Sequence, residues 1–395
     1  MAWIPMDLIV NVLARMPVKS LMRFKCVSRS WYDLISDRGF VQLHLKRSLE
    51  TNSRTSIVIG NQSLYSLDLE NINSCTEIYN DLGGLMRFPS IVGSCNGLLC
   101  LAYNDPKRTL VLYNPYSRMY KKVPPSSNEL KGHSLIIQNG NFGFGYDSAH
   151  DDFKIVSILQ FPGMEGFGYR NAAYVYSMNN DSWESIEPPP CLFLCHATTP
   201  ALVNGVLYWI GVDYPGSYSY CSVVGFSLSD QSFVKVPPPQ HYDICKSLEL
   251  GELSGCLSLQ VKAGLVAHVW MMKGYGAEFS WIKLCSISIA RFGDSWCGMK
   301  SLAYSRNGRE LFFWWRGKGL FSYDLEEKSF KKVEIPRFPT TPMLNDAMLC
   351  IESLVQPSGG CFVTRKQDIT VVRTENGIKG CDRKLELPLE VSFGN

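Results

Sequence analysis

The feature that most constrains this chain is a pair of aromatic residues, seven positions apart, that recurs about every fifty residues. Turn-forming residues lie between the two aromatics, and an apolar residue follows three positions after the second. The pairs with this spacing are Tyr113 and Tyr120, Tyr176 and Trp183, Phe226 and Phe233, and Tyr323 and Phe330. A fifth copy, Trp270 and Trp281, has four extra residues in its turn. Each copy predicts a β-hairpin.

A second recurring element is a glycine turn that leads into an apolar strand. Its copies are Asn96-Gly97, Asn204-Gly205, Ser254-Gly255 and Asn307-Gly308. Asn-Gly between apolar segments is a strong signal for a tight hairpin turn. In the unit that contains Tyr176, Gly145-Tyr146-Asp147 takes this place, and the unit carries an insertion at 161–170.

The two elements together predict about four strands per fifty-residue unit, which is the range of kelch-like β-propellers. A weaker first unit at 57–78 brings the number of units to six. We therefore expect an all-β, kelch-like β-propeller of about six blades over residues 57–357. A ring must close to protect its edges, and residues 350–355 are the expected closing strand. The remainder, 358–395, is expected to be a C-terminal extension that is partly disordered, with poor order beyond about residue 380.

A short α-helical segment precedes the ring. Leu8, Ile9, Val12, Leu13 and Met16 recur at helical spacing, and Pro17 ends that helix. Ser28 is the expected N-cap of a later helix that carries Trp31. Residues 1–45 are thus predicted to be a small helical domain, and 46–56 a linker. A module of about forty residues has too small a core to stand alone easily, so it is typical of a docking module.

Charge also separates the two parts. Residues 1–50 hold eight Lys/Arg against four Asp/Glu, whereas the whole chain has a net charge of +3, so the rest is close to neutral. A basic head could suit nucleic acid, but its basic residues are scattered rather than gathered in a stripe, and they suit an acidic protein partner equally well.

Residues 4–45 resemble the F-box closely. The match includes Ile4-Pro5, Arg15-Met16-Pro17-Val18-Lys19-Ser20-Leu21 and Arg23-Phe24-Lys25-Cys26-Val27-Ser28-Arg29-Ser30-Trp31. The resemblance implies binding to the Skp adaptor of a cullin-based ubiquitin ligase. Carried over by position, the adaptor-facing residues are Ile4, Pro5, Leu8, Ile9, Leu13, Pro17, Leu21, Cys26, Val27 and Trp31.

The body resembles the kelch-associated region of plant F-box proteins. Gly93-Ser94-Cys95-Asn96-Gly97-Leu98, Tyr113-Asn114-Pro115, Gly143-Phe144-Gly145-Tyr146-Asp147-Ser148, Asp152-Phe153-Lys154-Ile155-Val156 and Val269-Trp270-Met271-Met272 carry the likeness. It implies the substrate-recognition subunit of an SCF-type ligase, which binds a target protein and promotes its ubiquitination and degradation. Within the family, the sequence most resembles the F-box proteins that restrain plant immunity by removing resistance receptors. The rival is the pollen self-incompatibility type, which recognises secreted ribonucleases, and a further alternative is a non-degradative scaffold.

A propeller enzyme is the alternative, and it would need catalytic or metal-binding residues at the mouth of the ring. Cys191, Cys195 and His196 lack the C-x-x-C spacing of zinc sites. Asp147, His150, Asp151 and Asp152 form the densest polar cluster, but they fall in an expected hairpin turn. We therefore expect no metal or other cofactor and a non-catalytic receptor, because the adaptor and cullin would bring the conjugating enzyme to the target.

No segment is apolar enough to predict membrane insertion, and the opening residues do not resemble a signal peptide. We therefore expect a cytoplasmic or nuclear protein with reduced thiols.

The target-binding residues are expected on aromatic-rich loops at one end of the ring. Three loops fit: 161–170 with Phe167, Tyr169 and Arg170; 213–220 with Tyr214, Tyr218 and Tyr220; and 274–279 with Tyr275 and Phe279.

Overall fold

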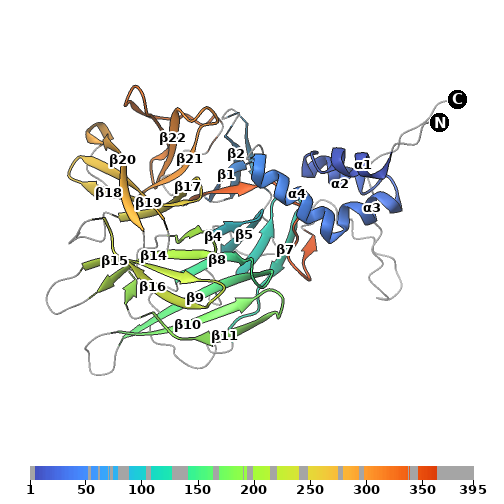
Figure 1. Ribbon diagram of the computed structural model, residues 1–395, viewed down its shortest axis with the longest axis horizontal. Coiled ribbons are helices and arrows are strands. Elements are labelled where there is room, and N and C mark those ends of the chain that lie inside the picture. The colour runs from blue at the N-terminus through green and yellow to red at the C-terminus, as the bar shows by residue number, and fades with distance from the viewer. Residues whose placement is uncertain are drawn as a thin grey trace, which may run out of the picture. The chain divides into compact units, whose positions relative to one another are not determined.

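A helical head precedes a ring of antiparallel sheets in the computed structural model (Figure 1). The structure describes residues 5–51, 55–60, 63–69, 71, 74–78, 89–103, 108–126, 141–162, 169–189, 191–193, 199–213, 220–239, 248–274, 279–292, 298–336, 338 and 346–362. The head comprises α1 (Met6–Leu13), α2 (Val18–Phe24), α3 (Arg29–Ser36) and α4 (Arg38–Thr51). Helix α4 runs through the first six residues of the predicted linker, 46–56, and the first strand begins at Thr55.

Within these described residues the strands form six sheets, which we call blades one to six and which confirm the predicted propeller. Blade one has the order β25 (Ala347–Ile351), β1 (Thr55–Gly60), β2 (Leu64–Asp68), β3 (Cys75–Ile78). Blade two has the order β4 (Ser90–Cys95), β5 (Leu98–Ala102), β6 (Leu110–Asn114), β7 (Met119–Lys122), β26 (Cys361–Phe362). Blade three has the order β8 (Asn141–Asp147), β9 (Asp152–Pro162), β10 (Tyr169–Ser177), β11 (Ser182–Ile186).

The remaining blades repeat this pattern. In blade four, β12 (Leu192–Phe193) and β13 (Ala201–Val203) both pair with β14 (Val206–Asp213), followed by β15 (Tyr220–Ser227) and β16 (Ser232–Val236). Blade five has the order β17 (Leu248–Leu253), β18 (Cys256–Ala263), β19 (Val266–Lys273), β20 (Ser280–Ser288), and a 3-10 turn, η4 (Ala290–Phe292), follows it. Blade six has the order β21 (Met299–Tyr304), β22 (Glu310–Trp315), β23 (Gly319–Asp324), β24 (Phe330–Lys332).

The aromatic repeat corresponds to directly opposed residues on the two outer strands of a blade. Tyr113 faces Tyr120, and the other three seven-residue pairs face each other in the same way. Opposed aromatic residues are among the more stabilising cross-strand pairs. The fifth copy departs from the prediction: Trp281 faces Met272 and Trp270 faces Lys283, so these two aromatic residues are not opposed.

The predicted glycine turns connect the first two strands of four blades. Asn96 and Gly97 both have positive φ, 51° and 84°, as a type I′ turn requires. A Cβ on Gly97 would lie 2.3 Å from the Cβ of Ser353, so glycine is needed there for space as well as for conformation.

The ring closes through its C-terminal strand. β25 pairs antiparallel with β1, so residues from both ends of the propeller share blade one. The predicted closing strand, 350–355, is displaced: β25 ends at Ile351, and residues 352–355 contact the head instead. The C-terminal extension contributes β26 to blade two, and the predicted disorder beyond residue 380 lies outside the described residues.

Apolar cores lie between neighbouring blades. Six clusters each join two successive blades, and the last of them joins blade six to blade one. The largest side chains that are fully buried include Trp209, Trp314 and Trp315. No blade could cover its own faces, so the ring gains its stability from stacking.

Two ends of the ring can be defined from strand direction. The innermost strands of the six blades are β25, β4, β8, β13, β17 and β21. Because neighbouring strands are antiparallel, the turns between the first and second strands of a blade, and between its third and fourth strands, lie at the end of the ring where the inner strands finish. We call this the head end, because its turns contact the head through Tyr116 and Asp151. The opposite end, where the inner strands start, is called the distal end.

Candidate functional site

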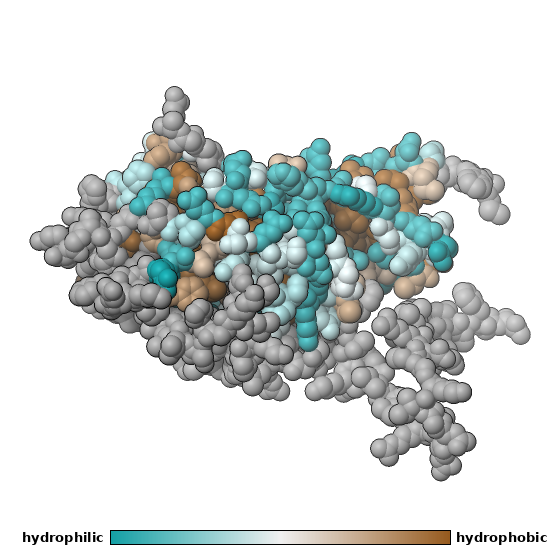
Figure 2. Space-filling view, turned by 90° about the horizontal axis from the view of Figure 1, so that it is seen from below, coloured by the Kyte–Doolittle hydropathy of each residue, from teal (hydrophilic) through white to brown (hydrophobic). Residues whose placement is uncertain are grey.

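Apolar side chains are exposed on the surface of the head. Met6, Leu8 and Val12 of α1 are 61%, 55% and 60% exposed, and Val27, after α2, is 66% exposed. Figure 2 shows apolar surface at the helical end of the molecule. Several exposed apolar side chains on one small domain are candidates for an interaction surface. We call Met6, Leu8, Val12 and Val27 the head patch.

The predicted adaptor-facing residues divide into four groups. Pro5, Leu8, Pro17, Cys26 and Val27 are exposed, whereas Ile9 and Trp31 are half-buried. Leu13 and Leu21 are buried at 3% and 0% exposure and belong to the core of the head, so they have no surface for a partner. Ile4 lies outside the described residues. Met6 and Val12 are exposed but are not among the residues predicted from the sequence. Val12 follows Leu8 at i+4, a spacing that places the two on one face of a helix.

The third helix is fixed locally as predicted. The Ser28 hydroxyl accepts a hydrogen bond from Trp31 N at 3.3 Å, which confirms the N-cap. The Trp31 ring packs edge-on against Phe24, with centroids 5.4 Å apart. These contacts hold the segment that carries Cys26 and Val27 between α2 and α3.

The ring takes part in the structure of the head. Pro17 precedes α2 without a side-chain cap, and the backbone N–H of Val18 donates to Glu352 Oε1 at 2.8 Å. This carboxylate satisfies one of the free N–H groups at the start of the helix. Leu354, 1% exposed, lies in the core of the head with Tyr116 packed alongside. We call residues 352–355 the joint.

The joint is also tied to blade two. Asn114 Nδ2 donates to the carbonyl oxygens of Ser353 and Val355 at 2.9 and 2.6 Å. The Tyr116 hydroxyl donates to the Cys350 carbonyl at 3.2 Å. The head is therefore packed on a segment that the ring itself holds in place.

The polar cluster at the turn between β8 and β9 is structural. Asp147 Oδ2 accepts from Lys154 Nζ and from His150 Nδ1, each at 2.7 Å. Burial acts to raise the pKa of Asp147, but these hydrogen bonds outweigh it, and the pKa lies below its usual value. Asp151 accepts from the Tyr146 hydroxyl and pairs with Arg38 of α4. Each carboxylate is thus used in the fold, and no group of three metal-ligating side chains occurs among the described residues.

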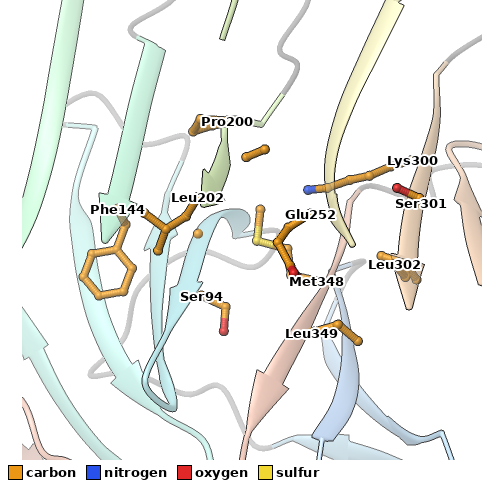
Figure 3. Close-up of a pocket in the computed structure, with 12 residues that line it drawn as sticks. Ser94, Phe144, Pro200, Leu202, Glu252, Lys300, Ser301, Leu302, Met348 and Leu349 are labelled. Carbon is orange, nitrogen blue, oxygen red and sulfur yellow. The ribbon is translucent and has the colours of Figure 1, made fainter. Parts of the chain in front are cut away.

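A cavity of about 100 Å³ lies on the axis of the ring, where all six inner strands contribute to its wall (Figure 3). Its lining residues are Gly93, Ser94, Phe144, Pro200, Ala201, Leu202, Glu252, Lys300, Ser301, Leu302, Met348 and Leu349. The wall is about equally polar and apolar, and Glu252 and Lys300 are its charged members.

Charged side chains gather close to the distal end of this cavity. Arg316 Nη2 lies 3.5 Å from Glu249 Oε1 and 3.7 Å from Asp346 Oδ2. Burial raises the pKa of Glu249 to about 7, despite the opposing effect of Arg316. Sequence reasoning had no signal for this cluster, because its members come from β17, the end of β22 and the start of β25.

The predicted target loops do not share one end of the ring. Strand direction places Tyr169, Arg170 and Tyr220 at the distal end, where β10 and β15 begin. Arg170 is exposed. In contrast, Lys273 and Ser280 flank the third loop at the head end, because connections in an antiparallel blade alternate between ends.

The described part of the third loop belongs to the core. Phe279 packs, partly buried, against the cluster between blades four and five. Phe167, Tyr214, Tyr218 and Tyr275 lie outside the described residues.

Two smaller expectations can be checked. Nine cysteines of the described residues are free, but Cys221 on β15 is disulfide-bonded, which departs from the expectation of reduced thiols. Cys191 is buried, whereas Cys195 and His196 lie outside the described residues. Among the described helices, none has the length and apolar character to cross a membrane.

Comparison with known proteins agrees with both parts. The F-box domain family matches residues 2–43, and the F-box associated beta propeller domain family matches residues 55–357. The F-box protein CPR1 of Arabidopsis thaliana is 30% identical over 90% of this chain and 89% of its own length. An F-box/kelch-repeat protein of the same plant is 30% identical over 72% of this chain and 79% of its own length.

A helical head with an exposed apolar patch, a six-bladed ring and matches over both segments lead to one assignment: the chain belongs to the F-box proteins that carry an F-box associated beta propeller domain.

Proposed function

We propose that this chain is the substrate-recognition subunit of an SCF-type ubiquitin ligase. In this proposal the head patch, with Pro5, Pro17 and Cys26, binds the Skp adaptor and through it cullin. The distal end of the ring binds the target protein. The observation that carries the proposal is the combination of the F-box match with apolar side chains that the fold leaves exposed on the head.

The position of the two ends supports this division of labour. The head contacts the ring at the head end, through the joint and Tyr116, so that end is partly covered. The distal end carries Arg170 and the strand starts next to two of the predicted target loops. A target bound there would be held apart from the adaptor, and the chain would contribute proximity and orientation rather than chemistry.

The adaptor claim is tested with Leu8→Asp combined with Val12→Asp. Both side chains are more than half exposed, so we expect normal folding and loss of binding to purified Skp adaptor. The matched control is Leu265→Asp, which changes a leucine that is 50% exposed in the turn between β18 and β19 at the distal end. Calorimetric titration measures the binding. Equal adaptor affinity of the double variant and the wild type would contradict the proposal.

For the target, we propose a plant immune receptor, on the basis of the resemblance to F-box proteins that restrain immunity. The test is the half-life of resistance receptors in plant cells that express the wild type or the Leu8→Asp/Val12→Asp variant. A shorter half-life with the wild type alone supports degradation. Capture of secreted ribonucleases instead would favour the self-incompatibility type, and target binding without any change in target level would favour a scaffold.

A further inference from the structure

The axial cavity contains a buried ammonium group with few partners. Lys300, the second residue of β21, is 7% exposed, and its side chain points into the cavity (Figure 3). Its hydrogen bond to Thr199 Oγ1 is 3.4 Å long, close to the limit for such a bond. No carboxylate of the described residues lies within 4.0 Å of Lys300 Nζ. An ammonium group has three N–H donors, and burial of a charge without compensation is costly.

The nearest acidic groups are already engaged elsewhere. Asp346 Oδ2 accepts from Thr199 Oγ1, Asp346 Oδ1 accepts from Ala347 N at 3.0 Å, and Arg316 lies beside the same carboxylate. Glu249 also faces Arg316. Glu252, on the strand β17 that packs next to β21, accepts from the backbone N–H of Gly255. The acids thus bond to other groups. The Lys300 ammonium group interacts electrostatically with Glu249 and Glu252, but among the described residues its one hydrogen bond is the long one to Thr199.

The size of the cavity limits what could enter it. A volume of about 100 Å³ exceeds what a single water needs but is far below the pockets that hold drug-sized ligands. The wall combines Lys300 and Glu252 with apolar residues such as Phe144, Leu202 and Leu302. A short chain of methylene groups that ends in a carboxylate would contact the apolar residues and reach Lys300. Burial raises the pKa of Glu252, which lessens the repulsion between that acid and an incoming carboxylate.

We propose that the axial cavity is a carboxylate-binding subsite, in which Lys300 pairs with one carboxylate of the target protein. This inference rests on the proposed function, because the target would reach the cavity from the distal end, where Thr199, Lys300 and Asp346 lie at or near the starts of inner strands. The carboxylate belongs either to an acidic side chain or to a chain terminus. Recognition of a buried charge in this way would make the subsite selective against amides of the same shape.

The experiment uses four short peptides and the full chain. One pair is an acetylated glycine tetrapeptide with a free carboxyl terminus and its C-terminal amide. The other pair is an acetylated, amidated glycine pentapeptide with a central glutamate, and its glutamine counterpart. Calorimetric titration gives the affinity of each peptide. We expect one carboxylate peptide to bind about tenfold or more tightly than its amide partner, and the responding pair identifies the source of the carboxylate.

Variants connect this preference to the cavity. Lys300→Met should remove the preference for the carboxylate peptide over its amide. The control Lys332→Met, which changes an exposed lysine on β24, should retain this preference. Met348→Glu places a carboxylate on the chain inside the cavity and should also remove it, which provides a second test if Lys300→Met does not fold. Equal affinity for acid and amide in the wild type, or a preference that survives either cavity variant, would overturn the proposal. Adaptor binding is measured separately, so failure of the proposed function would be distinguishable.

Discussion

The head and the ring use apolar residues in opposite ways. The ring buries them in six clusters that each join two blades, and its most deeply buried aromatic residues include Trp209, Trp314 and Trp315. The head has one small cluster, completed by Leu354 from the joint, and leaves Met6, Leu8 and Val12 exposed. The difference indicates that the ring supports itself through its own cores, whereas the head leaves apolar side chains exposed and depends on the ring for part of its core.

The strongest way to test the first half of this comparison is Trp315→Ala in blade six. Trp315 is 0% exposed and contacts Phe292, Phe321 and Phe330 in the core that joins blades five and six. Removal of the indole leaves a cavity that should lower the free energy of unfolding by about 4 kcal/mol. Urea denaturation followed by circular dichroism measures this loss. The control Ile282→Ala, on an exposed side chain of β20, should change it little.

The dependence of the head on the ring is tested by Leu354→Ala. Leu354 follows the closing strand, but its contacts are in the core of the head, so the cost of about 3 kcal/mol should fall on the head. Hydrogen exchange should become faster in α1 to α4 while the strands of blades two to six keep their protection. Gln356→Ala, at an exposed position beyond the joint, is the control. Faster exchange in every blade, to the same degree, would contradict a separate role for the joint.

The ring was largely predictable from sequence because its repeat is a local property. Asn96-Gly97 and the pair Tyr176 and Trp183 each define a hairpin within ten residues, and the six-bladed ring follows from their period. The joint was not predictable, because the bond from Val18 to Glu352 spans 334 residues. The same limit applies to blade-two strand β26 and to the cluster around Glu249, whose members are distant in sequence.

The head shows a different limit. Leu8 and Leu13 are both apolar residues of one short helix, and the F-box resemblance assigns both to the adaptor. Only the packing of α1 against the other helices and Leu354 shows that Leu13 is inside and Leu8 outside. A sequence pattern reveals that a helix has an apolar face, but in a module this small it does not decide which part of that face the fold covers.

The ring, unlike the head, contains a buried acid that makes its stability depend on pH. Glu249 has its pKa raised from 4.5 to about 7 by burial, next to Arg316, Asp346 and Lys300. Because the pKa is raised on folding, the native state binds this proton more tightly than the unfolded state does. The resulting stabilisation of the native state is fully present below pH 4.5 and is lost as the pH rises through 7. We expect the free energy of unfolding to decrease by about 2 kcal/mol between pH 5 and 8 in the wild type.

Glu249→Gln tests this contribution, because glutamine cannot ionise. Urea titrations at several pH values should show a flatter profile for Glu249→Gln than for the wild type. Glu77→Gln, at an exposed position on β3, should leave the wild-type profile unchanged. A profile that is equally steep in Glu249→Gln would show that another group is responsible.

The smallest expected effect concerns the ion pair between head and ring. Arg38 of α4 pairs with Asp151, but their side chains are 75% and 42% exposed, and water and salt weaken such pairs. A double-mutant cycle with Arg38→Gln and Asp151→Asn should give a coupling energy of about 0.5 kcal/mol that decreases in 0.5 M salt. The Tyr146 hydroxyl still donates to the residue at 151, so the turn itself should persist. A coupling as large as the effect of Leu354→Ala would mean that charge, rather than the apolar joint, holds the head on the ring.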